Sequence, residues 1–287
     1  MKKILSISAL CLGSILCLGL FNSVSMCQEA EEKTENKNIV PKSPCAEIPS
    51  FLYDAFTKFG RIPVGYRVLD ESYTSSNPIV FTKEWVGNLI HSANNRNTYY
   101  YGPTDHYLYQ AIEKYLPYIK NKEVAILGSR LPWYEAIIIS FGGRPTTIEY
   151  NKLVSQDIRL KVMTVDEYDK NPKKFDALVS ISSFEHDGLG RYGDPINPDG
   201  DLKAMEKCKS MLKEGGLLFL AVPVGKDLLM WNVHRIYGEI RLQLLLEGWE
   251  IVDSFGFNET DLQSSKGGLD GSDQHQPIFV LKPKSNK

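Results

Sequence analysis

Short continuous apolar runs recur through the second half of the chain, separated by segments whose apolar residues follow a helical spacing. The runs are bounded by glycine or polar residues and predict buried strands at 123–127, 145–150, 160–163, 175–181, 217–222, 249–252 and 276–281. The segments between them predict helices at 133–141, 202–212 and 231–247, and Thr164 and Glu167 are spaced as the capping box of a further helix. Apolar strands alternating with helices predict an α/β fold with a doubly wound, mainly parallel sheet over residues 121–287.

The N-terminal part of the chain follows a different pattern. Lys2 and Lys3 precede an apolar stretch at 4–21, which predicts a signal peptide or a signal-anchor within residues 1–27. Such a segment directs the body into the secretory pathway, as a lumenal or extracellular protein that is either secreted or held by a single membrane span through residues 4–21. Residues 28–47 are polar and predict a solvated linker.

Residues 48–120 predict an N-terminal extension rich in aromatic residues, with a helix at 105–118. We expect these aromatic side chains to pack the extension onto the main domain. The alternative is that they form a lid or a wall of a substrate site.

Composition excludes some classes of protein. The net charge is −2, and no block of basic residues supplies the phosphate contacts of a nucleic-acid-binding protein. The 5 cysteines do not form a disulfide framework, because three of them lie in or beside the apolar N-terminal stretch. A bond between the other two, Cys45 and Cys208, stays open. Asn258-Glu259-Thr260 is a glycosylation sequon, consistent with a lumenal body.

One half of a candidate ligand site follows the first two strands of the sheet. Gly128 and Ser129 end the first strand, and Glu149 ends the second, about 20 residues later, as expected of an acid that binds ribose hydroxyls. The loop lacks the further glycines of a G-x-G-x-x-G motif that holds a pyrophosphate. This favours a nucleoside ligand without phosphates, such as S-adenosylmethionine. The alternative is a tight turn beside a solvated acid.

The other half follows the strand at 175–181, where residues 182–195 are dense in acids, glycine and histidine. Ligands of open α/β sheets bind outside the carboxyl ends of the strands. Three interpretations compete: His186 or a nearby acid such as Asp187 acts as a general base, His186 and two carboxylates hold a divalent ion, or the loop is structural. We do not favour the metal-binding interpretation over the other two, and no metal ligands are predicted.

A second cluster, Asn232-Val233-His234-Arg235, opens the helix predicted at 231–247. By the same crevice rule its first residues face the cleft, where His234 and Arg235 could hold an anionic or sugar-like acceptor. On helical spacing His234 and Tyr237 share one face. The alternative is a packing histidine and a surface arginine.

These residues occur in the same order as in one family, the domain-of-unknown-function family 268, and the chain resembles it over about residues 60–285. The segments that carry the resemblance are Val124–Ser129, Pro132–Ala136, Thr147–Asn151, Ser182–Pro195, Pro198–Leu202 and Trp231–Gly238. The resemblance implies a Rossmann-like fold similar to that of class I S-adenosylmethionine-dependent methyltransferases. It implies that Gly128 begins the first glycine motif, that Glu149 is the ribose acid, and that Ser182, Ser183 and Glu185 flank the methionine part of the cofactor.

The sequence therefore leads to a hypothesis of methyl transfer from S-adenosylmethionine to an oxygen of a small-molecule or glycan acceptor. The residues assigned to the acceptor and its chemistry are His186, Asp187, His234 and Arg235. Two alternatives remain: a non-catalytic binding or scaffold protein on the same fold, and another nucleotide-using enzyme such as an NAD-dependent dehydrogenase.

Overall fold

The computed structural model describes residues 44–72, 78–265 and 275–284. Residues 42–287 form one compact unit. The predicted signal segment at 1–27, and the predicted linker up to residue 43, lie outside the described residues. Within the described ranges, no helix is both long enough and apolar enough to cross a bilayer.

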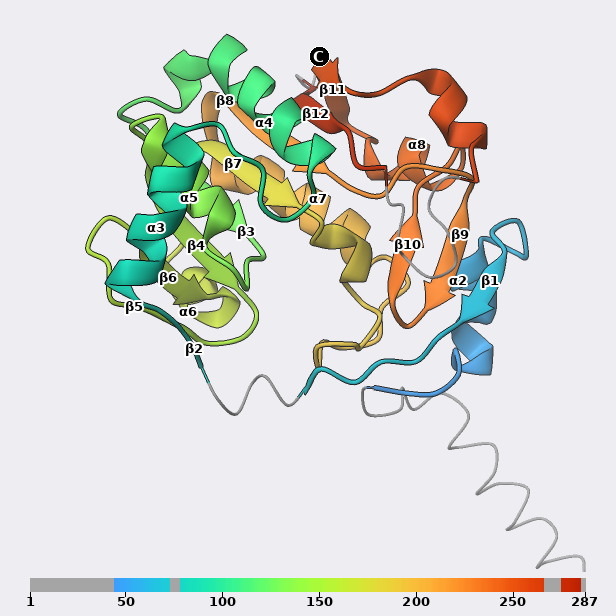
Figure 1. Ribbon diagram of the computed structural model, residues 1–287. Helices are drawn as coiled ribbons and strands as arrows, with labels where there is room; N and C mark the ends of the chain where they lie inside the picture. The colour runs from blue at the N-terminus through green and yellow to red at the C-terminus, as the bar shows by residue number, and fades with distance from the viewer. Residues whose placement is uncertain (1–43, 73–77, 266–274, 285–287) are drawn as a thin grey trace, which may run out of the picture. The chain divides into compact units, whose positions relative to one another are not determined.

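A seven-stranded sheet forms the centre of this unit (Figure 1). Its strands are β3 (Glu123–Leu127), β4 (Arg144–Glu149), β6 (Lys161–Thr164), β7 (Phe175–Ile181), β8 (Leu212–Ala221), β11 (Trp249–Phe255) and β12 (Ile278–Pro283). Their order is β11-β12-β8-β7-β3-β4-β6, with β12 antiparallel to both of its neighbours and the strands from β8 to β6 parallel. The predicted doubly wound, mainly parallel α/β fold is confirmed.

Helices cover both faces of the sheet. Successive side chains of β3 point to opposite faces and are apolar from Val124 to Leu127, so both faces must be shielded from water. Val124 and Ile126 pack in one core with α3 (Lys83–Asn94), α4 (Pro103–Lys114) and α5 (Trp133–Ser140). Ala125 and Leu127 pack in the opposite core with α6 (Val165–Lys170), α7 (Gly200–Met211) and α8 (Arg241–Leu245). Thr164 caps α6 in a capping box with Glu167, as predicted.

The prediction of one helix over residues 231–247 is wrong. The segment instead contains β9 (Leu228–Trp231), β10 (His234–Ile236) and the short α8. β9 pairs in parallel with β1 (Val64–Tyr66) of the extension and antiparallel with β10, so its apolar run is buried in a small second sheet. Helix α8 begins only after Ile240, where the Asp227 carboxylate accepts the backbone N–H groups of Ile240 (2.8 Å) and Arg241 (2.9 Å).

The N-terminal extension packs against the main sheet domain. Its short elements are η2 (Ser50–Leu52), α2 (Tyr53–Thr57), β1 and β2 (Ile79–Phe81), and β2 pairs with β5 (Leu153–Ser155). Four of its tyrosines lie against the core on the α5 face: Tyr101, Tyr107, Tyr115 and Tyr118. The expectation that the aromatics pack the extension onto the main domain is confirmed for these residues, whereas the boundary at residue 120 stays a prediction.

Candidate functional site at the carboxyl ends of the central strands

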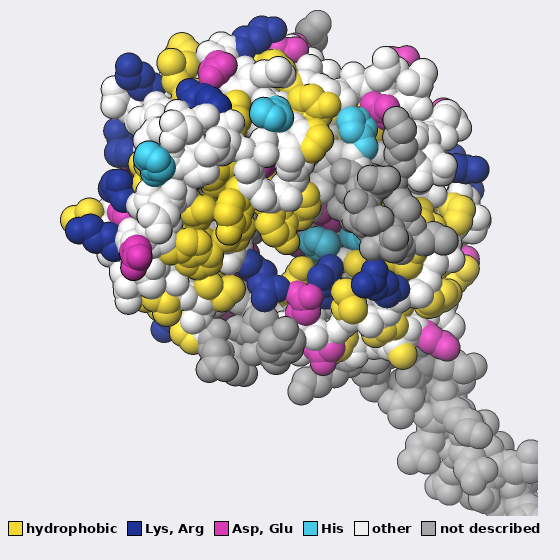
Figure 2. All heavy atoms as spheres, viewed as in Figure 1, with side chains coloured by type: hydrophobic (Ala, Val, Ile, Leu, Met, Phe, Trp, Pro, Cys, Tyr) yellow, Lys and Arg dark blue, Asp and Glu magenta, His cyan; other side chains and the backbone are white. Residues whose placement is uncertain are grey.

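The site lies where the strand order reverses. β3 is flanked by β4 on one side and β7 on the other, so the loops after these three strands meet at one edge of the sheet. Figure 2 shows a hollow in this face of the molecule, bordered by hydrophobic, basic, acidic and histidine side chains.

The predicted cofactor residues after β3, β4 and β7 lie together. Gly128 has a φ of 75°, and a Cβ atom at this position would lie 2.0 Å from Ser183 Oγ, so glycine is needed for both conformation and space. The Ser129 N–H donates to Glu149 Oε2 at 2.8 Å, and Glu149 Oε1 accepts the N–H groups of Tyr150 (2.9 Å) and Asn151 (3.3 Å). The carboxylate thus faces the glycine turn and is not turned out into solvent.

Burial raises the pKa of Glu149, and the hydrogen bonds from the backbone of Ser129, Asn151 and Tyr150 oppose that rise. The bonds also fix the direction of the side chain. Gly128, Ser129, Ser183 and Glu149 therefore form one rigid wall of the site.

A buried acid follows β7 in the second half of the site. Ser182, at a strained φ of 51°, donates from Oγ to Glu185 Oε1 at 2.5 Å. Glu185 is 0% exposed, and its Oε2 has no hydrogen-bond partner among the described residues. Burial raises the pKa of Glu185 to about 7, against the lowering effect of the Ser182 hydrogen bond. This residue was predicted as a cofactor contact, but its buried acid group is also suited to proton transfer.

His186 and His234 both lie in this half and are neutral at pH 7. His186 Nδ1 lies 2.6 Å from the Val233 carbonyl oxygen, which can only accept, so Nδ1 carries the proton and Nε2 the lone pair. Nε2 lies 3.7 Å from Glu185 Oε1. Burial and the Arg191 charge lower the pKa of His186 to about 3, and burial lowers that of His234 to about 4. The two rings are 6.4 Å apart, although His234 lies on a strand and not on the predicted helix.

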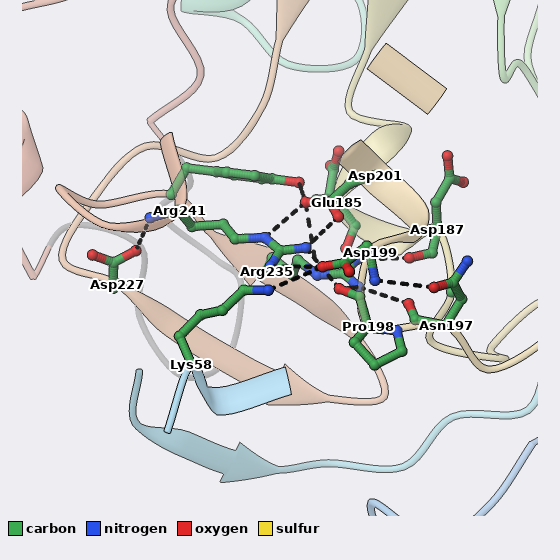
Figure 3. A network of polar contacts seen from close by, with 12 residues as sticks. Lys58, Glu185, Asp187, Asn197, Pro198, Asp199, Asp201, Asp227, Arg235 and Arg241 are labelled. Carbon is green, nitrogen blue, oxygen red and sulfur yellow. Dashed lines mark hydrogen bonds and ion pairs between the residues drawn. The ribbon is translucent and has the colours of Figure 1, made fainter. Parts of the chain in front are cut away.

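Arg235 and Asp187 hold the loop together. Arg235 is 4% exposed, and its Nη1 donates to the Asp187 carbonyl oxygen at 2.7 Å and to the Glu185 carbonyl oxygen at 3.4 Å (Figure 3). The interpretation of Arg235 as a surface residue is wrong, and its donors serve loop carbonyls. Burial and the Asp194 charge raise the pKa of Asp187 well above its usual range.

Two further groups lie at the site and were not among the predicted site residues, although the alternative of a substrate wall formed by the aromatic extension included Tyr101. The side chain of Tyr101, from the extension, shares a hydrogen bond with Ser182, and burial raises its pKa. Tyr101 follows two further tyrosines in a loop that Asp105 holds in place. The Asp105 Oδ2 atom accepts the backbone N–H groups of Tyr99 (2.8 Å) and Tyr100 (3.3 Å). Glu71 forms ion pairs with Arg130 and Arg191 across the site. Arg130 could have been suspected from its place directly after Ser129, whereas Glu71 lies far from the site in sequence.

In the described parts of the chain, no three His, Cys, Asp or Glu side chains are grouped so that they could hold a metal ion. Cys45 and Cys208 are free thiols, so the bond left open by the sequence is not formed.

Fold and site together define a doubly wound α/β protein with a candidate ligand site at the switch point of its sheet. The chain belongs to the DUF268 family, described as "Caenorhabditis protein of unknown function", whose model matches residues 121–282. No curated protein matches the sequence.

Several solved structures are similar in fold. The 1,6-didemethyltoxoflavin-N1-methyltransferase of Burkholderia thailandensis, solved with 1,6-didemethyltoxoflavin and S-adenosylhomocysteine, is 14% identical at a TM-score of 0.47, over 85% of this chain and 94% of that one. The glycopeptide N-methyltransferase MtfA is 10% identical at a TM-score of 0.42, over 73% of this chain and 95% of that one. The CcbJ methyltransferase of Streptomyces caelestis is 11% identical at a TM-score of 0.41, over 70% and 98%.

Proposed function

We propose that the protein is an S-adenosylmethionine-dependent methyltransferase that methylates an oxygen of a small-molecule or glycan acceptor. The observation that carries the proposal is the Glu149 carboxylate, which ends the second strand of the parallel sheet and faces the Gly128–Ser129 turn. A carboxylate in that place accepts hydrogen bonds from the two hydroxyl groups of a ribose.

The residues present fit this cofactor better than a dinucleotide. Glu149 Oε2 accepts one hydrogen bond within the described structure, from Ser129, which leaves it a second lone pair for a ribose hydroxyl. The turn has no glycine series that would bring successive N–H groups to a pyrophosphate. The sheet also departs from the dinucleotide-binding strand order, because the antiparallel β12 lies between β8 and β11.

Bound S-adenosylmethionine would supply an electrophilic methyl group. The protein must then remove the proton from the acceptor hydroxyl as the oxygen attacks. A base is most effective when its pKa lies near the working pH, and the carboxyl group of Glu185, with a pKa of about 7, meets that condition. His186 Nε2 lies 3.7 Å from Glu185 Oε1, but at a pKa of about 3 it is too weak a base, so the proton is assigned to the Glu185 carboxyl group.

The test is a calorimetric titration of the folded protein with S-adenosylhomocysteine, followed by the same titration of Glu149→Gln. We expect micromolar binding by the unmodified protein and at least tenfold weaker binding by the variant, because an amide offers one acceptor atom where the carboxylate offers two. Glu250→Gln, an exposed acid on β11 paired with Lys282, is the matched control and should bind as the unmodified protein does. No binding at millimolar cofactor by folded protein would contradict the proposal, and tighter binding of NAD would favour the dehydrogenase.

A non-catalytic binding protein is the second candidate. It is favoured by Arg235, which was predicted to hold the acceptor but donates to the carbonyl oxygens of Glu185 and Asp187 instead. Cofactor binding by both Glu185→Gln and the unmodified protein, with no methyl transfer to any hydroxyl acceptor by either, would support it.

The secretory localisation predicted from residues 1–27 is part of the same proposal. Asn258 of the sequon is exposed, which makes it accessible to a glycosyltransferase. Expression in animal cells should give a glycosidase-sensitive form that is lost in Asn258→Gln. An unglycosylated cytosolic protein would contradict this part of the proposal.

A further inference from the structure

Two arginines from opposite walls of the site converge on one carboxylate. Arg130, directly after the Gly128–Ser129 turn, donates from Nη1 to Glu71 Oε2 at 2.6 Å. Arg191, in the loop after β7, donates from Nη2 to Glu71 Oε1 at 2.9 Å. Both guanidinium groups also lie over the ring of Tyr192, at 5.6 and 5.0 Å from its centroid. The arrangement is a paired-arginine site for an oxyanion, with Glu71 in the oxyanion position.

The arginine pair lies between the two halves of the candidate site. Arg191 Nη1 donates at 3.5 Å to the Val233 carbonyl oxygen, which also accepts from His186 Nδ1. Burial lowers the pKa of His186, and the charge of Arg191 lowers it further; burial raises the pKa of Glu149, and the charge of Arg130 opposes part of that rise. The arginine pair is therefore electrostatically coupled to both halves.

The Glu71 side chain can move away from the two arginines while its backbone stays in place. Its N–H donates to the Arg191 carbonyl oxygen at 2.9 Å, and Leu69 exchanges two hydrogen bonds with the Asn232 side chain, of 2.8 and 3.0 Å. These bonds hold the backbone at Glu71 and two residues before it. The buried Nε of Arg191 has no hydrogen-bond partner within the described residues, so this guanidinium has donor capacity left.

We propose that Arg130 and Arg191 bind an oxyanion group of the acceptor, a carboxylate or a phosphate, and that Glu71 holds this place until the acceptor displaces it. The assignment to an acceptor rests on the proposed function, whereas the anion site itself does not. The acceptor is then an anionic molecule whose charged group lies beside Glu185 and His186. Displacement releases Glu71 to solvent, which compensates part of the cost of desolvating the incoming anion.

The experiment measures binding of inorganic phosphate and, separately, of acetate by the full chain without cofactor. The variants are Glu71→Gln and the double variant Glu71→Gln/Arg130→Gln. We expect Glu71→Gln to bind one of the two anions at least tenfold more tightly than the unmodified protein, and the double variant to lose that gain. Phosphate or acetate as the preferred anion distinguishes a phosphorylated acceptor from a carboxylic acid.

Glu113→Gln is the matched control, because Glu113 forms a 3.0 Å surface pair with Arg96 and its loss changes the net charge equally. It should leave anion affinity unchanged. With folding verified by thermal melting, an unchanged affinity for both anions in Glu71→Gln, or a gain that survives Arg130→Gln, overturns the anion site.

S-adenosylhomocysteine binding, measured on the same samples, separates the two proposals. Cofactor binding without an anion gain rejects the arginine pair alone. An anion gain without cofactor binding keeps the anion site and rejects its assignment to a methyl acceptor.

Discussion

Two buried charged clusters lie close together, one around Asp201 at the start of α7 and the other around Glu185 in the loop after β7, and they are built in opposite ways. In the first, Asp201 is 0% exposed and accepts from Arg241 Nε (3.0 Å), from Arg241 Nη2 and from the Tyr237 hydroxyl (3.0 Å). Figure 3 shows this cluster, with Arg235 beside it. Burial alone would raise the pKa of Asp201, but the charges of Arg235 and Arg241 and the hydrogen bonds from Arg241 and Tyr237 lower it, so the acid is ionised.

In the second cluster, Glu185 is equally buried, yet it has no arginine in hydrogen-bond contact with its carboxyl group. Its pKa rises to about 7 and its Oε2 lacks a partner within the described residues. Buried polar groups are normally satisfied, and exceptions gather at functional sites. The comparison indicates that the Asp201 cluster stabilises the fold, whereas the unpaired acid of the Glu185 cluster supports the proton transfer proposed for it.

The largest expected effect is a loss of folding stability when the Asp201 cluster is broken. Asp201→Asn should lower the free energy of unfolding by about 3–5 kcal/mol, because it leaves the buried Arg241 without its counter-charge. Urea unfolding followed by circular dichroism measures the change. The control Asp169→Asn removes a 2.6 Å ion pair with Lys207 that is largely exposed and should cost less than about 1 kcal/mol. Equal losses in both variants would show that the Asp201 cluster does not stabilise the fold.

At neutral pH, Glu185→Gln should raise the free energy of unfolding, whereas Asp201→Asn should lower it. The pKa of Glu185 is about 7 in the folded protein and 4.5 in an unperturbed side chain, so the folded state binds more protons between these values. Wild-type stability attributable to this group is therefore lost as pH rises from about 4.5 to 7. Relative to the wild type, Glu185→Gln should gain on the order of 2–3 kcal/mol across that window.

Unfolding experiments at pH 4.5, 6 and 8 check this expectation. His186 and His234 titrate in both proteins, so their contributions cancel in the difference. A difference that stays constant with pH would mean that Glu185 keeps an ordinary pKa and is no candidate base.

Ser182→Ala should give the smallest effect and sharpen the comparison. The variant removes the hydroxyl that donates to Glu185 Oε1, so we expect a stability loss of about 1 kcal/mol and a further rise of the Glu185 pKa. Carbon-13 NMR of the carboxyl groups follows the titration, with Glu185→Gln identifying the signal. A fall of the Glu185 pKa in Ser182→Ala would contradict the hydrogen bond as the group that favours the ionised form.

The sequence predicted the strands of the main sheet well and the segment at 231–247 poorly. The strand at 175–181 was predicted with the bounds that β7 has, because a buried parallel strand is a continuous apolar run between polar ends. The segment at 231–247 was mistaken for one helix, because Ile236, Ile240, Leu244 and Leu245 also fit a helical spacing. Its true structure depends on pairing with β1, which lies far away in the chain.

The sequence by itself determined the strands of the main sheet and the edge at which a ligand would bind, since these follow from local periodicity and from the rule that loops after parallel strands meet. Only the tertiary structure decided the state of each charged group. Asp201, Glu185 and Glu71 are all acids in the sequence, but distant arginines, or their absence, make the first ionised, the second poised near pH 7 and the third a bridge between Arg130 and Arg191. Burial and charges from residues distant in the sequence set these properties, and neither can be predicted from the neighbouring residues in the chain.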